Sequence, residues 1–263
     1  MLGGPEFLSV GSDARQIAVL RRAGRAPGLF WLSGYRSEMV GTKAEALDAL
    51  GAEMDLAVTR FDYSGHGQSG GDFLKGTISR WLEEALAVFQ TTKGPQIIVG
   101  SSIGGWIALL LARALRRAAP DRVKALILIA PAVDATAELM EKRLTAAEQH
   151  VLQRDGVVYR ASQYSETPYP YTRALIEDGR NHLLFGRGIE TGCPVTILQG
   201  ARDPDVPPAH AMKLVQHLLI DPTTLTLVPD GDHRLSRESD LALLRDAVKR
   251  QVGAPAQQLR LEL

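Results

Sequence analysis

Short apolar runs alternate with amphipathic stretches along nearly the whole chain, and this alternation restricts the fold more than any other feature. The runs are almost entirely apolar and bounded by Gly or Pro, which is typical of strands covered on both faces. The predicted strands are 28–33, 55–61, 96–99, 124–130, 195–199 and 224–228. The predicted helices are 42–52, 77–90, 105–118, 208–219 and 236–252. Such alternation predicts an α/β fold with a mostly parallel central sheet flanked by helices. We expect an antiparallel pair, 6–10 and 16–22, at the edge of the sheet, and a single domain over 1–263.

One segment, 134–192, breaks this rhythm, because it separates two predicted strands by far more chain than a crossover helix needs. Helical patterns occupy 135–153 and 173–184. The chain between them is rich in tyrosine and punctuated by proline, with Tyr159, Tyr164, Tyr169 and Tyr171. An insertion at the carboxyl end of a strand overlies the ligand crevice of an open α/β sheet. We therefore expect a small helical cap whose Tyr164, Tyr169 and Tyr171 contact substrate. The alternative is a structural excursion without substrate contact.

A candidate nucleophile lies in residues 100–104 (GSSIG), which match the pattern G-x-S-x-G. In this pattern the serine occupies a sharp turn between a strand and a helix, where its hydroxyl is exposed. Ser102 directly follows a predicted strand and precedes a long apolar helix. Residues 67–71 (GQSGG) match the same pattern, but Ser69 follows its strand only after several loop residues and no helix comes next. The context favours Ser102, and a buried structural serine is the alternative interpretation.

The same glycine-rich loop also matches a dinucleotide-binding pattern, since residues 65–70 (GHGQSG) read G-x-G-x-x-G. That pattern requires the loop to leave its strand at once and to open a helix, so that helix N–H groups face a pyrophosphate. The loop meets neither condition. The sequence therefore predicts no nicotinamide or flavin cofactor.

A serine hydroxyl needs a base to accept its proton, and histidine suits that role because its pKa lies near neutral pH. His233 follows the last predicted strand, whereas the other histidines are interpreted as surface or packing residues: His66, His150, His182, His210 and His217. The imidazole in turn needs a carboxylate to orient it. Asp203 follows the strand at 195–199 and is the first choice. Asp205 is the fallback, and Asp232 is disfavoured because neighbouring side chains seldom point together.

The tetrahedral intermediate of acyl transfer carries an oxyanion that needs two N–H donors. The residue after the nucleophile normally supplies one of them, and the loop after an early strand supplies the other. We therefore expect the backbone N–H groups of Ile103 and Tyr35 to form the oxyanion hole, with Gly34 allowing the chain to turn.

Composition excludes several other classes of protein. Lys plus Arg and Asp plus Glu both total 30, so a zero net charge gives no sign of a nucleic-acid or anionic-membrane partner. The single Cys193 allows no internal disulfide, fits a reducing compartment and is expected to have no catalytic role. No secretory signal and no long apolar span is evident, so we expect a cytoplasmic protein. No metal-ligand cluster and no cofactor is predicted, and the oligomeric state is left open.

Several local strings also resemble a known family. They are 33–35 (SGY) with 41–44 (GTKA), 60–65 (RFDYSG), 100–106 (GSSIGGW), 164–166 (YSE) and 232–234 (DHR). The chain resembles the α/β-hydrolase superfamily along nearly its whole length. Within that superfamily it is similar to the group of the mycophenolic acid acyl-glucuronide esterase and palmitoyl-protein thioesterase, with their bacterial relatives. The resemblance implies hydrolysis of carboxylic esters and thioesters, from a small-molecule or acylated-protein substrate. By position, it places the family's catalytic triad on Ser102, Asp203 and His233.

The sequence therefore predicts a serine esterase or thioesterase that works through an acyl-enzyme. A C–C bond or lactone hydrolase could use the same triad. A non-catalytic α/β-hydrolase that binds a ligand is a further alternative from a different class, although such proteins usually lack a triad member.

Overall fold

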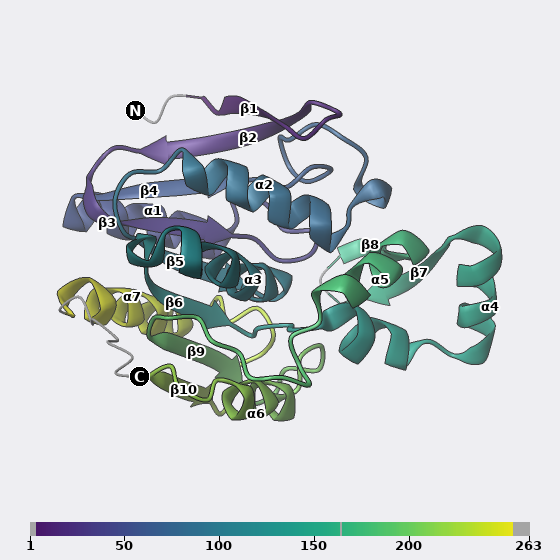
Figure 1. The fold of residues 1–263 in the computed structure, drawn as a ribbon. Coiled ribbons are helices and arrows are strands. Elements are labelled where there is room, and N and C mark those ends of the chain that lie inside the picture. Colours follow the sequence, from purple (N-terminus) through teal and green to yellow (C-terminus); the bar gives the residue numbers. More distant parts are fainter. Residues whose placement is uncertain (1–3, 164, 255–263) are drawn as a thin grey trace.

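The computed structural model describes residues 4–163 and 165–254, which form a central sheet with helices on both sides and a projecting segment (Figure 1). The 8-stranded sheet has the order β1-β2-β4-β3-β5-β6-β9-β10. Its strands are β1 (Glu6–Val10), β2 (Arg15–Arg22), β3 (Arg25–Leu32), β4 (Leu56–Phe61), β5 (Gln96–Ser101), β6 (Val123–Ile129), β9 (Val195–Gly200) and β10 (Thr223–Val228). This arrangement confirms the predicted α/β class.

Six neighbouring strands run parallel: β4, β3, β5, β6, β9 and β10. The two strands at the β1 edge do not. β1 pairs antiparallel with β2, and β2 pairs antiparallel with β4. The antiparallel edge agrees with the sequence prediction. Every position of β5 and β9 is buried, which explains why both sequences are so apolar.

Two layers of helices cover the sheet. One layer holds α2 (Ile78–Gln90), α3 (Ile103–Ala118) and α6 (Pro208–His217). The other holds α1 (Thr42–Met54) and α7 (Glu238–Gly253). The central helix α3 is buried on most of its surface, as its run of Ile, Leu and Ala predicts. Three short helices connect larger elements: η1 (Phe73–Lys75), η2 (Pro120–Arg122) and η5 (Arg180–His182).

The segment 134–192, called the cap below, projects from the sheet after β6 (Figure 1). It contains η3 (Thr136–Met140), η4 (Glu141–Arg143), α4 (Ala146–Asp155), β7 (Val157–Ser162), β8 (Ser165–Thr172) and α5 (Arg173–Gly179). The prediction of a helical cap was therefore incomplete, because the tyrosine-rich chain forms an antiparallel hairpin. The predicted helix 135–153 is also interrupted, since Thr145 and Glu148 form a capping box that starts a new helix.

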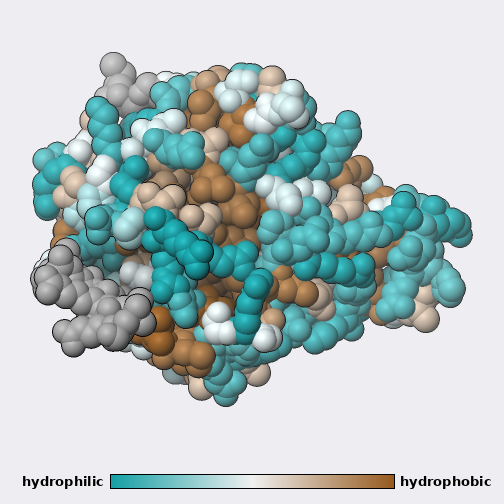
Figure 2. All heavy atoms as spheres, viewed as in Figure 1, coloured by the Kyte–Doolittle hydropathy of each residue, from teal (hydrophilic) through white to brown (hydrophobic). Residues whose placement is uncertain are grey.

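Hydrogen bonds close the base of the cap and join it to α3. The carboxylate of Asp134 accepts the N–H groups of Leu184 and Phe185, both at 2.8 Å. The indole N–H of Trp106, on α3, donates to the carbonyl of His182 at 3.2 Å. The far end of the cap has a mostly hydrophilic surface (Figure 2). Within the described residues, no helix is long and apolar enough to cross a membrane.

Candidate active site

Ser102 occupies the sharp turn from β5 into α3. Its backbone is left-handed, with φ 55° and ψ −121°, and its N–H donates to the carbonyl of Ile129 at 2.8 Å. A non-glycine residue in this conformation is strained, and such strain persists only where the surroundings enforce it. Gly104 is part of that enforcement, because a Cβ there would lie 2.2 Å from the carbonyl oxygen of Leu32. Close backbone packing therefore requires a glycine at position 104, two residues after Ser102.

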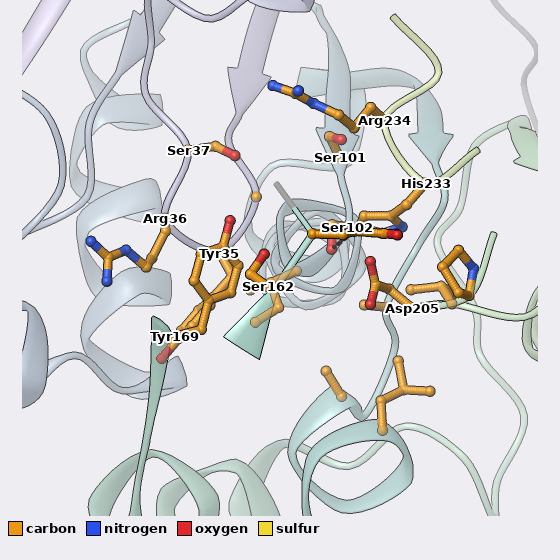
Figure 3. A pocket seen from close by; sticks show the side chains of 18 of the residues that line it. Tyr35, Arg36, Ser37, Ser101, Ser102, Ser162, Tyr169, Asp205, His233 and Arg234 are labelled. Atoms are coloured by element: carbon orange, nitrogen blue, oxygen red, sulfur yellow. Dashed lines mark hydrogen bonds between the residues drawn. The ribbon is translucent and has the colours of Figure 1, made fainter. Parts of the chain in front are cut away.

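The predicted serine, histidine and aspartate lie in one hydrogen-bonded row (Figure 3 shows the first two). Ser102 Oγ is 3.1 Å from His233 Nε2, and His233 Nδ1 is 2.7 Å from Asp203 Oδ2. A carboxylate only accepts hydrogen bonds, so the neutral imidazole carries its hydrogen on Nδ1. Nε2 is then left to accept the serine proton. This geometry is that of a nucleophile beside an oriented base.

Asp203 is held rigidly at the end of β9. It is 4% exposed, and its Oδ1 accepts the N–H groups of Asp205 and Val206 at 2.9 and 2.8 Å. The side chain of Asp205 lines the pocket instead of bonding His233. Asp232 uses Oδ1 to accept the N–H groups of the two residues that follow His233. Of the three candidate carboxylates, the structure brings Asp203 to the imidazole.

The residues that the sequence analysis set aside lie elsewhere. Ser69 donates its hydroxyl to the carbonyl of Asp62 at 2.6 Å and accepts the N–H of Ala18 at 2.8 Å, so it joins its loop to β2. Cys193 is buried beside Thr191, and burial raises the pKa of its thiol to about 12. The contacts of Ser69 and Cys193 are therefore those of structural residues.

The other histidines serve packing, with one refinement. His150 is exposed on α4, and the rings of His182, His210 and His217 bond neighbouring hydroxyl or carbonyl groups. His66 is a buried packing residue, which the sequence interpretation allowed, and it is in addition hydrogen-bonded to the backbone of the loop after β3. No local sequence signal indicates that contact.

Two backbone N–H groups beside Ser102 are available for an oxyanion. Ile103 is the first residue of α3, so its N–H has no partner within the helix. The N–H of Tyr35 donates to no acceptor among the described residues. Tyr35 follows Gly34, where an added Cβ would be only 3.3 Å from the Cβ of Ser102, so this loop lies directly against the nucleophile. The arrangement fits the two predicted donors.

The side chain of Tyr35 joins this loop to the cap. Its hydroxyl donates to the carbonyl of Pro170 in β8, and burial raises its pKa, which keeps the donor protonated. The ring makes edge contacts with Phe73, Tyr169 and Tyr171, with centroids 5.0, 5.9 and 6.4 Å away. One residue thus places a candidate oxyanion donor and contacts the roof of the pocket.

The pocket above Ser102 has a volume of about 630 Å³ and lies between the sheet and the cap. Its cap side combines apolar and aromatic side chains with polar ones. The apolar and aromatic residues are Ala135, Leu139, Met140, Ala161, Tyr169 and Tyr171, and the polar ones are Arg143, Arg160, Ser162 and Gln163. The structure places Tyr169 and Tyr171 at the pocket, and their contact with substrate stays a prediction. Tyr164 lies outside the described residues.

The opposite side of the pocket is polar, and sequence reasoning missed it. Lys43 and Arg234 line it together with Ser37 and Ser236. The ammonium of Lys43 donates to the carbonyl of Arg234 and to Ser236 Oγ, so it connects α1 to the loop of His233. Burial lowers the pKa of Lys43 to about 8. A lysine in the first turn of a predicted helix gives no sign of this role.

Ligand atoms of Asp203, Asp205 and His233 lie within 4.8 Å of one another, a spacing that would suit a metal ion. However, Asp203 Oδ2 and His233 Nδ1 already face each other at hydrogen-bonding distance. Binding a cation at those atoms would replace the bond that orients the imidazole. Asp203 and His233 already belong to the row that leads to Ser102.

The fold and this row of side chains define the class of the protein, an α/β-hydrolase. A family model for serine aminopeptidase S33 matches residues 29–174, more than half of the chain. The chain belongs to this family and is a hydrolase.

Three similar proteins define its position more narrowly. The mitochondrial palmitoyl-protein thioesterase ABHD10 of Homo sapiens is 34% identical over 234 residues, which cover 88% of this chain and 75% of the relative. The solved structure of the mouse protein has a TM-score of 0.84 at 31% identity, covering 94% of this chain and 98% of that one. A crystal structure from Agrobacterium vitis S4 has a TM-score of 0.91 at 50% identity, with the same coverage.

Proposed function

We propose that this hydrolase cleaves carboxylic ester or thioester bonds through an acyl-enzyme on Ser102. The observation that carries the proposal is the row Ser102–His233–Asp203, with distances of 3.1 and 2.7 Å. His233 takes the serine proton while Oγ attacks the acyl carbon. It then gives that proton to the leaving alcohol or thiol, and later activates the water that releases the acid.

The oxyanion that forms in each half of the reaction would be held by the N–H groups of Tyr35 and Ile103. Each such donor contributes about 3 kcal/mol to the lowering of a barrier of this kind. Both lie beside a strained serine whose position the fold dictates, so little reorganisation is needed when charge develops.

The substrate we propose has an apolar acyl group. The apolar and aromatic side chains on the cap side of the pocket support this, with Leu139, Met140, Tyr169 and Tyr171 among them. The palmitoyl-protein thioesterases among the relatives act on thioesters of this kind by name. An acylated protein and an acyl glucuronide are the two substrate types that we place first. We also propose a reducing, cytoplasmic location, on the sequence argument alone.

The test is a series of aryl esters and acyl thioesters of increasing chain length, with an acyl glucuronide included. We expect hydrolysis of esters or thioesters, and a loss of at least about 10⁴-fold in kcat for Ser102→Ala and for His233→Ala, without additivity in the double variant. Inertness toward every ester and thioester would contradict the proposal. Hydrolysis confined to lactones or to C–C bonds would contradict the proposed reaction and show that the same triad catalyses a different one.

Labelling with a fluorophosphonate separates an enzyme from a ligand-binding relative. We expect covalent labelling of the wild-type protein, abolished in Ser102→Ala. Ser69→Ala is the matched control, because Ser69 lies in the other G-x-S-x-G string. Label retained in Ser102→Ala and lost in Ser69→Ala would overturn the assignment of the nucleophile.

A further inference from the structure

The glycine-rich loop after β4, residues 62–71, lies against the loop that carries Tyr35. Two of its side chains accept backbone N–H groups from that loop. Asp62 Oδ1 accepts the N–H of Met39 at 2.6 Å, and His66 Nε2 accepts the N–H of Arg36 at 3.3 Å. This loop contains residues 65–71, whose sequence matches a nucleophile pattern and a dinucleotide-binding pattern but lacks the context that either requires. Its hydrogen bonds indicate that it supports the neighbouring loop instead.

The contact at His66 has a defined proton arrangement. Nδ1 lies 3.2 Å from the carbonyl of Ser64, and a carbonyl only accepts. The imidazole hydrogen is therefore on Nδ1, and Nε2 is free to accept the N–H of Arg36. The ring bridges the two loops in its neutral form.

The surroundings of His66 keep it neutral and immobile. Its side chain is 5% exposed and packs among the rings of Tyr63, Phe73 and Trp81, with centroids 5.8, 4.8 and 5.4 Å away. Burial lowers the pKa of His66 to about 4, and the nearby Arg36 guanidinium acts in the same direction. The acceptor on Nε2 is therefore present throughout the neutral pH range.

Arg36 needs such a partner because its backbone is strained. Its φ is 53°, in the left-handed region, where a residue with a side chain is disfavoured by about 1–2 kcal/mol. The turn is closed on its other side by the bond from Ser37 N–H to the carbonyl of Gly34, at 3.1 Å. Tyr35 thus lies inside a tight turn, and His66 holds the peptide group that follows it, between Tyr35 and Arg36.

We propose that His66 is a positioning residue of the oxyanion hole, which holds the Tyr35–Arg36 peptide so that the Tyr35 N–H faces the developing oxyanion. This inference rests on the proposed acyl-enzyme function. His66 touches neither the nucleophile nor the pocket, so it acts through the turn. Its loss should weaken binding of the tetrahedral state and leave binding of the ground-state substrate nearly unchanged.

Three variants separate the acceptor from the ring. His66→Phe keeps a flat ring and loses both hydrogen bonds. His66→Asn reaches the Ser64 carbonyl but is too short to accept from Arg36. His66→Gln places an amide oxygen near the position of Nε2. For each variant, kcat and KM are measured with the best ester or thioester, together with the inhibition constant of an alkyl boronic acid, which forms a tetrahedral adduct with the serine.

We expect His66→Phe and His66→Asn to lower kcat about 10- to 100-fold, less than removal of a whole donor, with KM within about threefold of the wild type. Boronate affinity should fall by a similar factor, and His66→Gln should recover most of both losses. This combined pattern is one that a merely structural role would not produce.

Wild-type kcat and boronate affinity in His66→Phe would overturn the inference, and so would an effect confined to KM. If His66→Phe does not fold, the pair His66→Asn and His66→Gln decides, and equal values for the two contradict the role of the acceptor. A wild-type enzyme that cleaves no ester or thioester would instead be a failure of the proposed function, which the chain-length series detects separately.

Discussion

The floor and the roof of the pocket are built differently. Ser102 and Asp203 follow β5 and β9, strands that are buried at every position and lie inside the main sheet. The roof is the hairpin β7–β8, whose strands pair with each other in a sheet of two. Its apolar support is a small separate cluster, formed by Leu144, Leu152, Val158 and Ile176. The proposed chemistry thus depends on the main sheet, whereas the proposed contact with the acyl group depends on a small attachment.

The largest expected effect is on kcat and concerns the floor of the pocket, formed by Ser102, His233 and Asp203. It tests how far the proposed catalysis depends on the Asp203 carboxylate. Asp203→Asn should lower kcat by about 10³- to 10⁴-fold, because an amide can hold the imidazole in the wrong tautomer. Asp205→Asn is the matched control at the pocket edge, and its effect should stay within about tenfold. Steady-state kinetics on one ester measures both. A larger loss in Asp205→Asn would reverse the assignment of the acid.

A pair of leucine truncations compares the stability of the two regions. Leu110 on α3 and Leu152 on α4 are 1% and 4% exposed. We expect Leu110→Ala to lower the free energy of unfolding by about 3–5 kcal/mol and Leu152→Ala by about 2 kcal/mol, because a small cluster collapses more easily around a cavity. Urea denaturation gives both values. Hydrogen exchange should show faster opening confined to the cap in Leu152→Ala, and uniform opening there would contradict a separate cap cluster.

Acid distinguishes a buried histidine below the cap, His66, from an exposed histidine of the cap, His150. The pKa of His66 is about 4 in the folded chain and near its ordinary 6.5 in the unfolded chain. As pH falls from 6.5 to 4, the unfolded chain binds a proton that the folded chain does not, so stability is lost. The loss approaches about 3 kcal/mol at most.

The nearby Arg36 guanidinium opposes a positive charge on His66, and the surrounding rings of Tyr63, Phe73 and Trp81 supply no negative charge to offset it. His66→Phe should therefore lose less unfolding free energy than the wild type between pH 7 and pH 4.5, as measured by denaturant titration. His150→Phe, on the exposed face of α4, is the control. Parallel pH curves for the wild type and His66→Phe would count against a buried neutral imidazole.

The smallest expected effect concerns the roof alone. Tyr169 lines the pocket, whereas Tyr159 on the neighbouring strand is 56% exposed. Tyr169→Ala should raise KM for a long-chain thioester by about three- to tenfold and change the value for an acetyl ester little, since apolar contact area is lost only for the longer chain. Tyr159→Ala should leave both values near those of the wild type. Equal effects on long and short substrates would argue against acyl contact at Tyr169.

The same contrast explains what could be predicted from sequence. The apolar runs specify buried strands, and side chains at the ends of such strands converge. Ser102 and His233 could therefore be selected from the pattern of residues, and the acid could be narrowed to Asp203 with Asp205 as the fallback. The hairpin could not be predicted, because Pro168 and Pro170 argue against strands, yet a two-stranded ribbon has outer edges where proline is tolerated.

The contact of His66 with the loop that carries Tyr35 could not be predicted from sequence, for a different reason. His66 bonds a main-chain N–H from a residue 30 positions earlier, and a backbone partner imposes no residue type at that position. Lys43 likewise contacts the Arg234 carbonyl across 191 positions. The choice between Asp203 and Asp205 also depends on three-dimensional geometry, since both follow the same strand and only their backbone turn decides which carboxylate faces the imidazole.

The bond from Tyr35 to the Pro170 carbonyl limits how this enzyme can be redesigned. Exchanging the hairpin for one from another hydrolase would be the natural way to change its preference for acyl chains. A grafted hairpin without a carbonyl at that point would leave the Tyr35 hydroxyl without its acceptor, at the residue whose amide we assign to the oxyanion. Grafts should therefore be selected for turnover on the shortest substrate first, and for chain preference afterwards.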